Sequence, residues 1–139
     1  MNARPTVAVL AVVLRENRLL LVRRANPPDQ GLWGYPGGRV EPGETHAAAA
    51  LRELAEETGI VADAPRLLTV LDFIERDVAG AVAHHFAMIT VACRWQAGEG
   101  LAADDALEAR WFDRTEIDAL GASASAQVAA IAALASAEG

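Results

Sequence analysis

The sequence has few of the residues that stabilise secreted domains or bind nucleic acid. It contains one cysteine, Cys93, which excludes an internal disulfide and fits a buried core thiol in a reducing cytoplasm. Its 12 basic residues are outnumbered by 19 acidic ones, giving a net charge of −7. A nucleic acid polymer needs a basic surface, so no polymer partner is expected. The apolar run Thr6 to Leu14 is too short to cross a bilayer and predicts a core strand, so no membrane association is expected.

What is present predicts a single compact domain over residues 1–139, because 53% of the residues are hydrophobic. Thr6 to Arg15 and Arg18 to Arg24 are rich in Val and Leu, which predicts two strands joined by a tight turn. The next segment, Ala25 to Pro36, carries three prolines and two glycines. It is expected to form an ordered, irregular loop.

The second half of the chain predicts a long hairpin, one further strand and two helices. These elements are expected at Leu67 to Arg76, Val82 to Trp95 (with the turn at Asp77 to Ala81), Ala109 to Asp113, Thr115 to Leu120 and Ala124 to Ala137. In the last helix, Val128, Ile131 and Leu134 are expected to face the sheet. The order of strands and helices predicts a mixed β-sheet covered by helices on both sides, an α/β/α sandwich.

Between these halves, a helix is predicted from His46 to Thr58. Thr45 can cap its start, and Gly59 can supply the left-handed residue that ends it. Spacings of three and four residues define an apolar stripe that should dock this helix on the core. The stripe consists of Ala47, Ala50, Leu51 and Leu54.

Charged residues gather on the other face of this helix. Glu53, Glu56 and Glu57 share that face, and Arg52 lies one turn before Glu56, with which it can pair. Like charges near the C-terminal end of a helix are unfavourable unless a cation binds there. Oxygen ligands suit hard ions, so Mg²⁺ is predicted, with Mn²⁺ as the alternative. An ordinary solvated acidic face is the alternative interpretation of the three glutamates taken alone.

The whole segment from Gly38 to Ile60 resembles the Nudix box, the signature of the Nudix hydrolase family. Its pattern is a glycine, five residues, a glutamate, seven residues, and then R-E-apolar-x-E-E-x-G-apolar. The matching positions are Gly38, Glu44, Arg52, Glu53, Leu54, Glu56, Glu57, Gly59 and Ile60. A chance match at all of them is on the order of one in ten million. The resemblance implies a Nudix-type α/β/α fold and an enzyme that hydrolyses a nucleoside diphosphate linked to another group.

The resemblance also implies roles for individual residues. Glu53, Glu56 and Glu57 would bind the metal together with the main-chain carbonyl of Gly37. Arg52 would orient a glutamate, and Glu44 would support the metal-binding glutamates. The general base stays open between a box glutamate and a carboxylate of the loop Gln96 to Ala106 or just beyond it. The candidates outside the box are Glu99, Asp104, Asp105 and Glu108, of which Asp105 is preferred for its spacing before Trp111.

Several residues outside the box are candidates for substrate contacts. Aromatic rings can stack on a nucleobase, although filling the core is the alternative for each of them. Arg39 follows Gly37 and Gly38 at the start of the box. His84 and His85 are expected on opposite faces of a strand, without a third ligand for a metal. The substrate-binding candidates are Trp33, Tyr35, Arg39 and Phe86, with Phe73 as a further stacking candidate.

The segment RRANPPDQGLWGYPGGRVEPGE, together with EARWF, resembles the small ADP-ribose pyrophosphatases of the family. That resemblance implies hydrolysis of ADP-ribose to AMP and ribose 5-phosphate, although Arg76 stands where many of these enzymes have proline. A MutT-type enzyme that converts a nucleoside triphosphate to a monophosphate and pyrophosphate is the alternative. A non-catalytic domain that binds a nucleotide metabolite is an alternative of another class. The expected partner is a small nucleotide, and the chain is expected to be a monomer or a homodimer.

Overall fold

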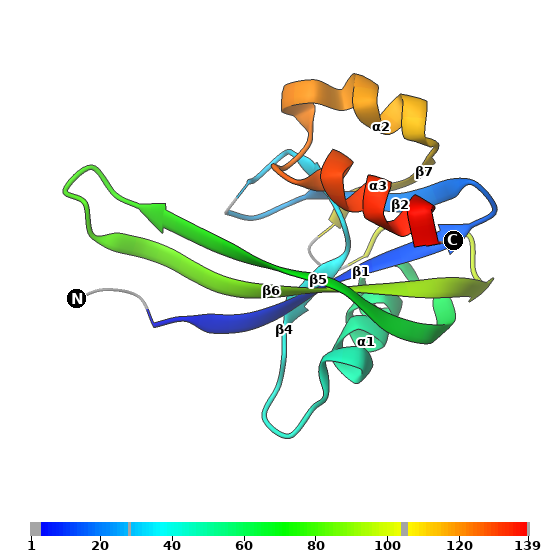
Figure 1. Ribbon diagram of the computed structural model, residues 1–139, viewed down its shortest axis with the longest axis horizontal. Helices are drawn as coiled ribbons and strands as arrows, with labels where there is room; N and C mark the ends of the chain where they lie inside the picture. The colour runs from blue at the N-terminus through cyan, green and yellow to red at the C-terminus, as the bar shows by residue number, and fades with distance from the viewer. Residues whose placement is uncertain (1–3, 28, 104–105, 139) are drawn as a thin grey trace.

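A mixed β-sheet lies between helices on both of its faces in the computed structural model, which describes residues 4–27, 29–103 and 106–138 (Figure 1). Its elements are β1 (Thr6–Arg15), β2 (Arg18–Arg24), β3 (Trp33–Gly34), β4 (Gly37–Arg39), α1 (His46–Thr58), β5 (Val61–Arg76), β6 (Val82–Ala97), β7 (Ala106–Phe112), α2 (Arg114–Leu120), the 3-10 turn η1 (Gly121–Ser123) and α3 (Val128–Glu138). In Figure 1, α1 lies below the sheet, and α2 and α3 lie above it. The predicted α/β/α sandwich is confirmed.

Strand β1 is the centre of this sheet. The strand order is β3-β2-β1-β6-β5, with β4 also paired to β1 and β7 to β2. β1 and β6 run parallel, whereas β4 pairs with β1 in antiparallel fashion, Gly38 opposite Val9 and Gly37 opposite Leu10. The near-continuous apolar sequence of β1 follows from this position, because both of its faces are covered. The pairing with β4 brings the start of the box to the middle of the sheet.

Helix α1 begins and ends where the sequence predicts. The Thr45 hydroxyl accepts a 3.1 Å hydrogen bond from the Ala48 N–H, and Gly59 ends the helix with a φ of 73°. Leu54 is fully buried and packs with the β1 residues Val9, Ala11 and Val13. The docking stripe is thus confirmed at Ala50 and Leu54, whereas Ala47 and Leu51 are only half-buried and Ala49 is buried instead. This packing fixes the orientation of the charged face of α1.

Several predicted strand boundaries are wrong. β5 begins at Val61 rather than Leu67, because an irregularity between Asp63 and Arg66 in its pairing with β6 accommodates Pro65. β7 begins at Ala106 rather than Ala109. Asp113 was expected to end that strand, but it is the N-cap of α2, and its carboxylate accepts a 2.8 Å hydrogen bond from the Glu116 N–H.

The C-terminal helix buries two of the three residues expected to face the sheet, Val128 and Ile131. α3 begins at Val128 rather than Ala124, and it buries Val128, Ile131, Ala132 and Ala135. Leu134 is 44% exposed, so its predicted contact with the sheet is wrong. Ala132 and Ala135 are buried and have small side chains, so α3 can lie close to the core. Among the described residues, no helix is long and apolar enough to cross a membrane.

Cys93 lies in β6 on the α1 side of the sheet. Its side chain is 2% exposed, and its Sγ atom lies 3.9 Å from the main-chain oxygen of Val12. Burial raises the pKa of this thiol to about 12, with Asp63 adding to the rise and Arg66 opposing it. The predicted core thiol is therefore confirmed.

Candidate metal and nucleotide site

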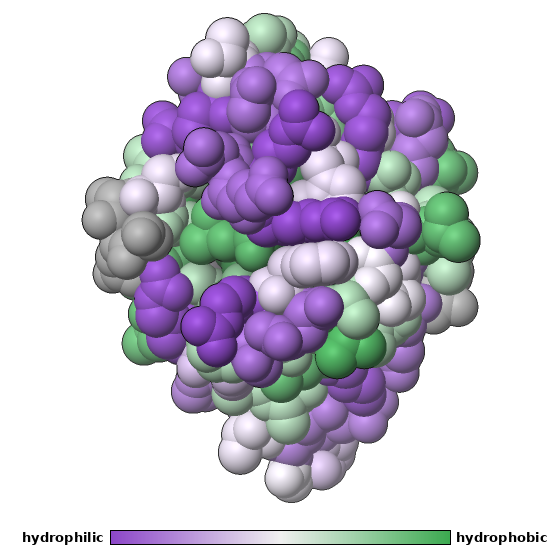
Figure 2. Space-filling model, turned by 90° about the vertical axis from the view of Figure 1, so that its right-hand side faces the viewer, coloured by the Kyte–Doolittle hydropathy of each residue, from purple (hydrophilic) through white to green (hydrophobic). Residues whose placement is uncertain are grey.

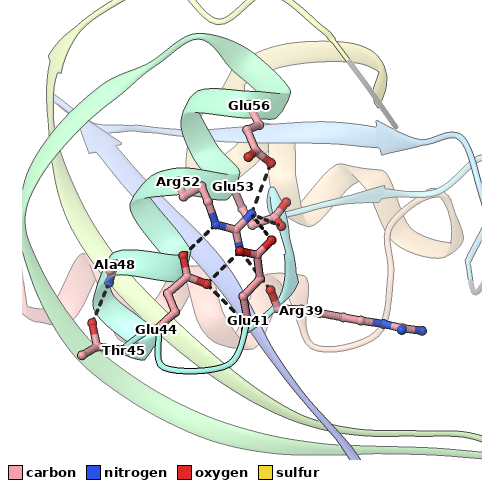
Figure 3. A network of polar contacts seen from close by, with 8 residues as sticks. All are labelled: Arg39, Glu41, Glu44, Thr45, Ala48, Arg52, Glu53 and Glu56. Atoms are coloured by element: carbon pink, nitrogen blue, oxygen red, sulfur yellow. Dashed lines mark hydrogen bonds and ion pairs between the residues drawn. The ribbon is translucent and has the colours of Figure 1, made fainter.

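Arg52 is the centre of a network of carboxylates on the charged face of α1 (Figure 3). Its guanidinium donates two hydrogen bonds to Glu44, from Nε at 2.7 Å and from Nη2 at 2.9 Å. Nη1 donates to Glu53 at 2.9 Å and to Glu56 at 3.2 Å, and Nη2 also donates to the main-chain oxygen of Arg39 at 3.1 Å. The predicted pairing of Arg52 with Glu56 is confirmed. Glu44, in turn, holds the arginine in place from outside the helix.

Within this network the pKa values of Glu44 and Glu53 are shifted in opposite directions. The hydrogen bonds from Arg52 lower the pKa of Glu44 from its ordinary value of 4.5 to about 2, and the same contacts raise the pKa of Arg52. The pKa of Glu53, by contrast, is raised, chiefly because burial disfavours its charge, and the neighbouring carboxylates of Glu56 and Glu44 add to the rise. A further positive charge near Glu53 would lower that pKa.

Glu57 lies apart from this network and is only 8% exposed. Its Oε2 atom accepts a 2.8 Å hydrogen bond from the backbone N–H of Gly37 in β4. An unpaired buried carboxylate would cost several kcal/mol, so this contact stabilises the charged form. Gly37 therefore lies beside a predicted metal ligand, as the role inferred for its carbonyl requires. That the carbonyl itself binds metal stays a prediction.

Gly38 leaves space that the Glu53 carboxyl group fills. A Cβ atom at this position would lie 2.6 Å from that group, closer than real contacts allow. Within the described ranges, no three His, Cys, Asp or Glu side chains lie close enough together to bind a metal ion. Arg52 and the Gly37 N–H form hydrogen bonds with the glutamates instead. The donor set nevertheless fits a hard divalent cation, since it consists of carboxylate oxygens.

Two of the predicted substrate-binding rings belong to the core. Trp33 is 9% exposed and packs edge-on against Phe112 at 5.0 Å between ring centroids. Tyr35 is 2% exposed, and its hydroxyl donates a 2.8 Å hydrogen bond to the main-chain oxygen of Val128. Burial also raises the pKa of Tyr35. Neither ring offers a free face, so the structure assigns both to the core rather than to a nucleobase.

The other substrate-binding candidates are more accessible. Phe86 is half-buried on β6, with the ring of Phe73 at 6.2 Å and that of His84 stacked at 6.5 Å. Phe86 pairs with Thr6 of β1, three positions from Val9, which is opposite Gly38; this is about 10 Å along the strand. The Arg39 side chain is exposed and extends away from the Arg52 network in Figure 3. His84 lies 3.6 Å from Glu75.

The carboxylates considered as loop bases differ in their surroundings. Asp104 and Asp105 lie outside the described residues. Glu99 is bound to Arg15 at 3.0 Å, and Glu108 is bound to Arg23 at 2.8 Å. A further contact was not predicted from the sequence: the N–H groups of Leu101 and Ala103 donate to the last turn of α1 at 3.0 and 2.8 Å. Gly98 and Gly100, both with positive φ, were the available signal that this segment turns tightly.

Taken together, the sheet and α1 define an α/β/α protein whose acidic helix suits a hard divalent cation. The chain belongs to the NUDIX domain family, whose model matches residues 4–133. Members of this family that act as hydrolases generally need divalent metal ions. The predicted family membership is confirmed.

Individual relatives agree with this assignment. The chain is 39% identical to an ADP-ribose pyrophosphatase of Methanocaldococcus jannaschii over 84% of its own length, but it spans 66% of that protein. A MutT NUDIX hydrolase structure from Burkholderia pseudomallei superposes with a TM-score of 0.80 at 28% identity, covering 95% of this chain and 98% of that one. A bifunctional NMN adenylyltransferase/ADP ribose pyrophosphatase of Francisella tularensis, complexed with AMP and a Mn ion, gives a TM-score of 0.73 at 27% identity, covering 97% of this chain and 42% of that one.

Proposed function

We propose that this protein is a divalent-metal-dependent pyrophosphohydrolase that cleaves a nucleoside diphosphate linked to another moiety. The observation that carries the proposal is the Arg52 network, which holds the box glutamates Glu53 and Glu56 through hydrogen bonds of 2.9 and 3.2 Å. ADP-ribose, hydrolysed to AMP and ribose 5-phosphate, is the first substrate proposed. The similarity to the Methanocaldococcus ADP-ribose pyrophosphatase supports that choice.

Glu53, Glu56 and Glu57 would hold Mg²⁺ or Mn²⁺, with the Gly37 carbonyl as a further ligand. A bound divalent cation supplies positive charge for the phosphate oxygens, on which negative charge spreads in the transition state. The role of Arg52 is to keep Glu53 and Glu56 on one side of α1, and the role of the Gly37 N–H is to fix Glu57. Glu44 keeps Arg52 in place through its two hydrogen bonds.

For the general base we propose Asp105, with a box glutamate as the alternative. The Ala103 N–H donates a hydrogen bond to the main-chain oxygen of Glu57. This contact supports the choice, because it brings the part of the loop that precedes Asp105 to the end of α1. Glu99 and Glu108 are less suitable, since each already forms an ion pair with an arginine. Arg39 and Phe86 are proposed to contact the substrate, as the exposed guanidinium could bind a phosphate and the half-buried ring could stack on a base.

A MutT-type nucleoside triphosphate pyrophosphatase is the second candidate. The Burkholderia MutT NUDIX hydrolase supports it, because that structure matches this chain over nearly the whole length of both proteins. Both candidate reactions require the same metal-binding carboxylates and break a phosphoanhydride bond. They differ in the group that must fit beside Arg39 and Phe86.

A turnover panel distinguishes these functions. The purified protein is assayed with Mg²⁺ or Mn²⁺ against ADP-ribose, NADH, diadenosine polyphosphates, sugar nucleotides and common and oxidised nucleoside triphosphates. ADP-ribose is expected to give the highest kcat/KM, with AMP as a product and no turnover after chelation. Faster hydrolysis of a nucleoside triphosphate would replace the substrate proposal with the MutT-type one. No turnover of any compound, together with a nucleotide-dependent rise in Tm, would show a binding domain instead.

A further inference from the structure

Arg15, at the end of β1, stacks against two indole rings and forms an ion pair with an acidic loop residue. Its guanidinium carbon lies 4.0 Å from the ring centre of Trp95 and 5.5 Å from that of Trp111. Both terminal nitrogens bind Glu99, at 3.0 and 3.4 Å. These four residues, Arg15, Trp95, Glu99 and Trp111, are called the arginine clamp. The turn between β1 and β2 lies on the right of Figure 1, the side that faces the viewer in Figure 2, where hydrophilic residues crowd the centre of the surface.

The arginine clamp also binds the backbone of the loop that follows β6. The indole N–H of Trp95 donates to the main-chain oxygen of Gly98 at 2.7 Å, and that of Trp111 donates to the main-chain oxygen of Glu99 at 3.0 Å. Gly98 comes so close to α1 that a Cβ atom there would lie 2.9 Å from the main-chain oxygen of Gly59. Side chains from three strands therefore hold one short stretch of backbone against the end of the box helix.

This stretch completes the last turn of α1. The final carbonyl groups of a helix lack partners within the helix. Here the Leu101 N–H donates to the Thr58 oxygen at 3.0 Å, and the Ala103 N–H donates to the Glu57 oxygen at 2.8 Å. Glu57 is therefore held at two points, with its carboxylate on Gly37 and its main-chain oxygen on Ala103.

We propose that Arg15 is a positioning residue for the metal site: the arginine clamp fixes residues 98–103, and these residues fix the end of α1 that carries Glu57. Arg15 acts through the loop and touches none of the box glutamates in the described network. The effect on turnover rests on the proposed hydrolase function, whereas the effect on the loop does not. An exposed ion pair alone would contribute little, but here it is combined with two stacked rings and two indole hydrogen bonds to the backbone.

The test compares Arg15→Gln with Arg110→Gln. Arg110 makes the same kinds of contact, with its guanidinium 4.4 Å from the Phe112 ring centre and 3.5 Å from Glu116, but it lies outside the clamp. Arg15→Gln is expected to speed amide hydrogen exchange at Leu101 and Ala103 by about tenfold or more. It should also lower kcat by roughly five- to tenfold with KM changed less than about twofold, since a slightly misplaced catalytic group costs mainly turnover. Arg110→Gln should change neither quantity.

Arg15→Lys provides the graded variant and stands in if Arg15→Gln does not fold. Lysine keeps a stacked charge but loses the paired hydrogen bonds, so its exchange rates and kcat should fall between those of Arg15→Gln and the wild type. Wild-type exchange at Leu101 and Ala103 in both variants would overturn the proposal. Faster exchange with unchanged kcat would overturn the link to the metal site. If the wild-type protein turns over nothing, the proposed function fails, and the exchange experiment still decides whether Arg15 fixes the loop.

Discussion

The backbone N–H of Gly37 donates a 2.8 Å hydrogen bond to the carboxylate of Glu57, joining β4 to the last turn of α1. Gly37 also pairs with Leu10 of the central strand β1. The position of the Glu57 carboxylate is therefore tied to the middle of the sheet rather than left to a flexible side chain. Such fixed placement is what a metal ligand needs, because reorganisation during the reaction raises the barrier.

Replacing Glu57 by glutamine should separate catalysis from folding. In Glu57→Gln the amide oxygen can still accept the Gly37 N–H, but the negative charge for a cation is lost. We expect kcat to fall by about 10²–10³ or more, with the free energy of unfolding changed by less than about 1 kcal/mol. Steady-state kinetics and chemical denaturation measure the two effects. Asp118→Asn, at an exposed carboxylate of α2, is the control, and a near-normal rate for Glu57→Gln would contradict the assigned role.

Alanine substitutions at Gly37 and Gly38 should have different consequences. In Gly38→Ala the new Cβ atom would lie 2.6 Å from the Glu53 carboxyl, which can move because it ends a flexible side chain. The fold should survive while activity and metal affinity fall. In Gly37→Ala the Cβ atom would meet the main-chain oxygen of Val9, which cannot move without disturbing β1. Thermal unfolding should show a much larger drop in Tm for Gly37→Ala, and equal drops would refute the distinction.

Acid should weaken the contact between Glu44 and Arg52. The folded pKa of Glu44 is lowered from 4.5 to about 2, so its contribution to stability is present above about pH 4.5 and is lost as the pH falls towards 2. The difference in unfolding free energy between the wild type and Glu44→Gln should therefore shrink over this window in chemical denaturation experiments. In an Arg52→Gln background the same substitution should show little pH dependence. A difference that grows on acidification would have the wrong sign for this ion pair.

The thiol of Cys93 should be unreactive in the folded protein. It is 2% exposed, and burial raises its pKa to about 12, so very little thiolate exists near neutral pH. Dithionitrobenzoate at about pH 8 should label no thiol in the native state and one after unfolding in urea, because thiolate forms readily at an exposed cysteine of ordinary pKa. Fast labelling of the native protein would show that β6 opens easily or that the side chain is accessible.

Signals within a few residues of each other predicted both ends of the box helix. Thr45 and Gly59 fix these ends through contacts inside the same turn. The carboxylate pattern likewise predicted that Arg52 pairs with Glu56, four positions away. Glu57 differs, because its burial depends on Gly37, which reaches it only through the pairing of β4 with β1.

Long-range packing accounts for the features that the sequence did not predict. For Trp33 and Tyr35 the sequence left both stacking on a nucleobase and filling the core open, and contacts with Phe112 and Val128, far along the chain, decide for the core. Leu134 follows the spacing of a buried stripe, yet α3 approaches the core through Ala132 and Ala135 and turns Leu134 outwards. Pro65 suggests a break, but an irregular pairing with β6 lets β5 continue through it. In each case the partner lies outside any local window.

The parallel pairing of β1 with β6 has a consequence for how the chain folds. Thr6 pairs with Phe86 and Leu14 with Arg94, so the central strand is made early in synthesis but gains this neighbour only after most of the chain has been made. Contacts between residues so distant in sequence slow folding, because a long loop must close before they form. The nascent chain must therefore carry an apolar β1 whose β6-facing edge is unpaired, and a box helix with an incomplete sheet beneath it. Exposure of apolar surface during synthesis is the consequence of a parallel pairing between strands so distant in sequence.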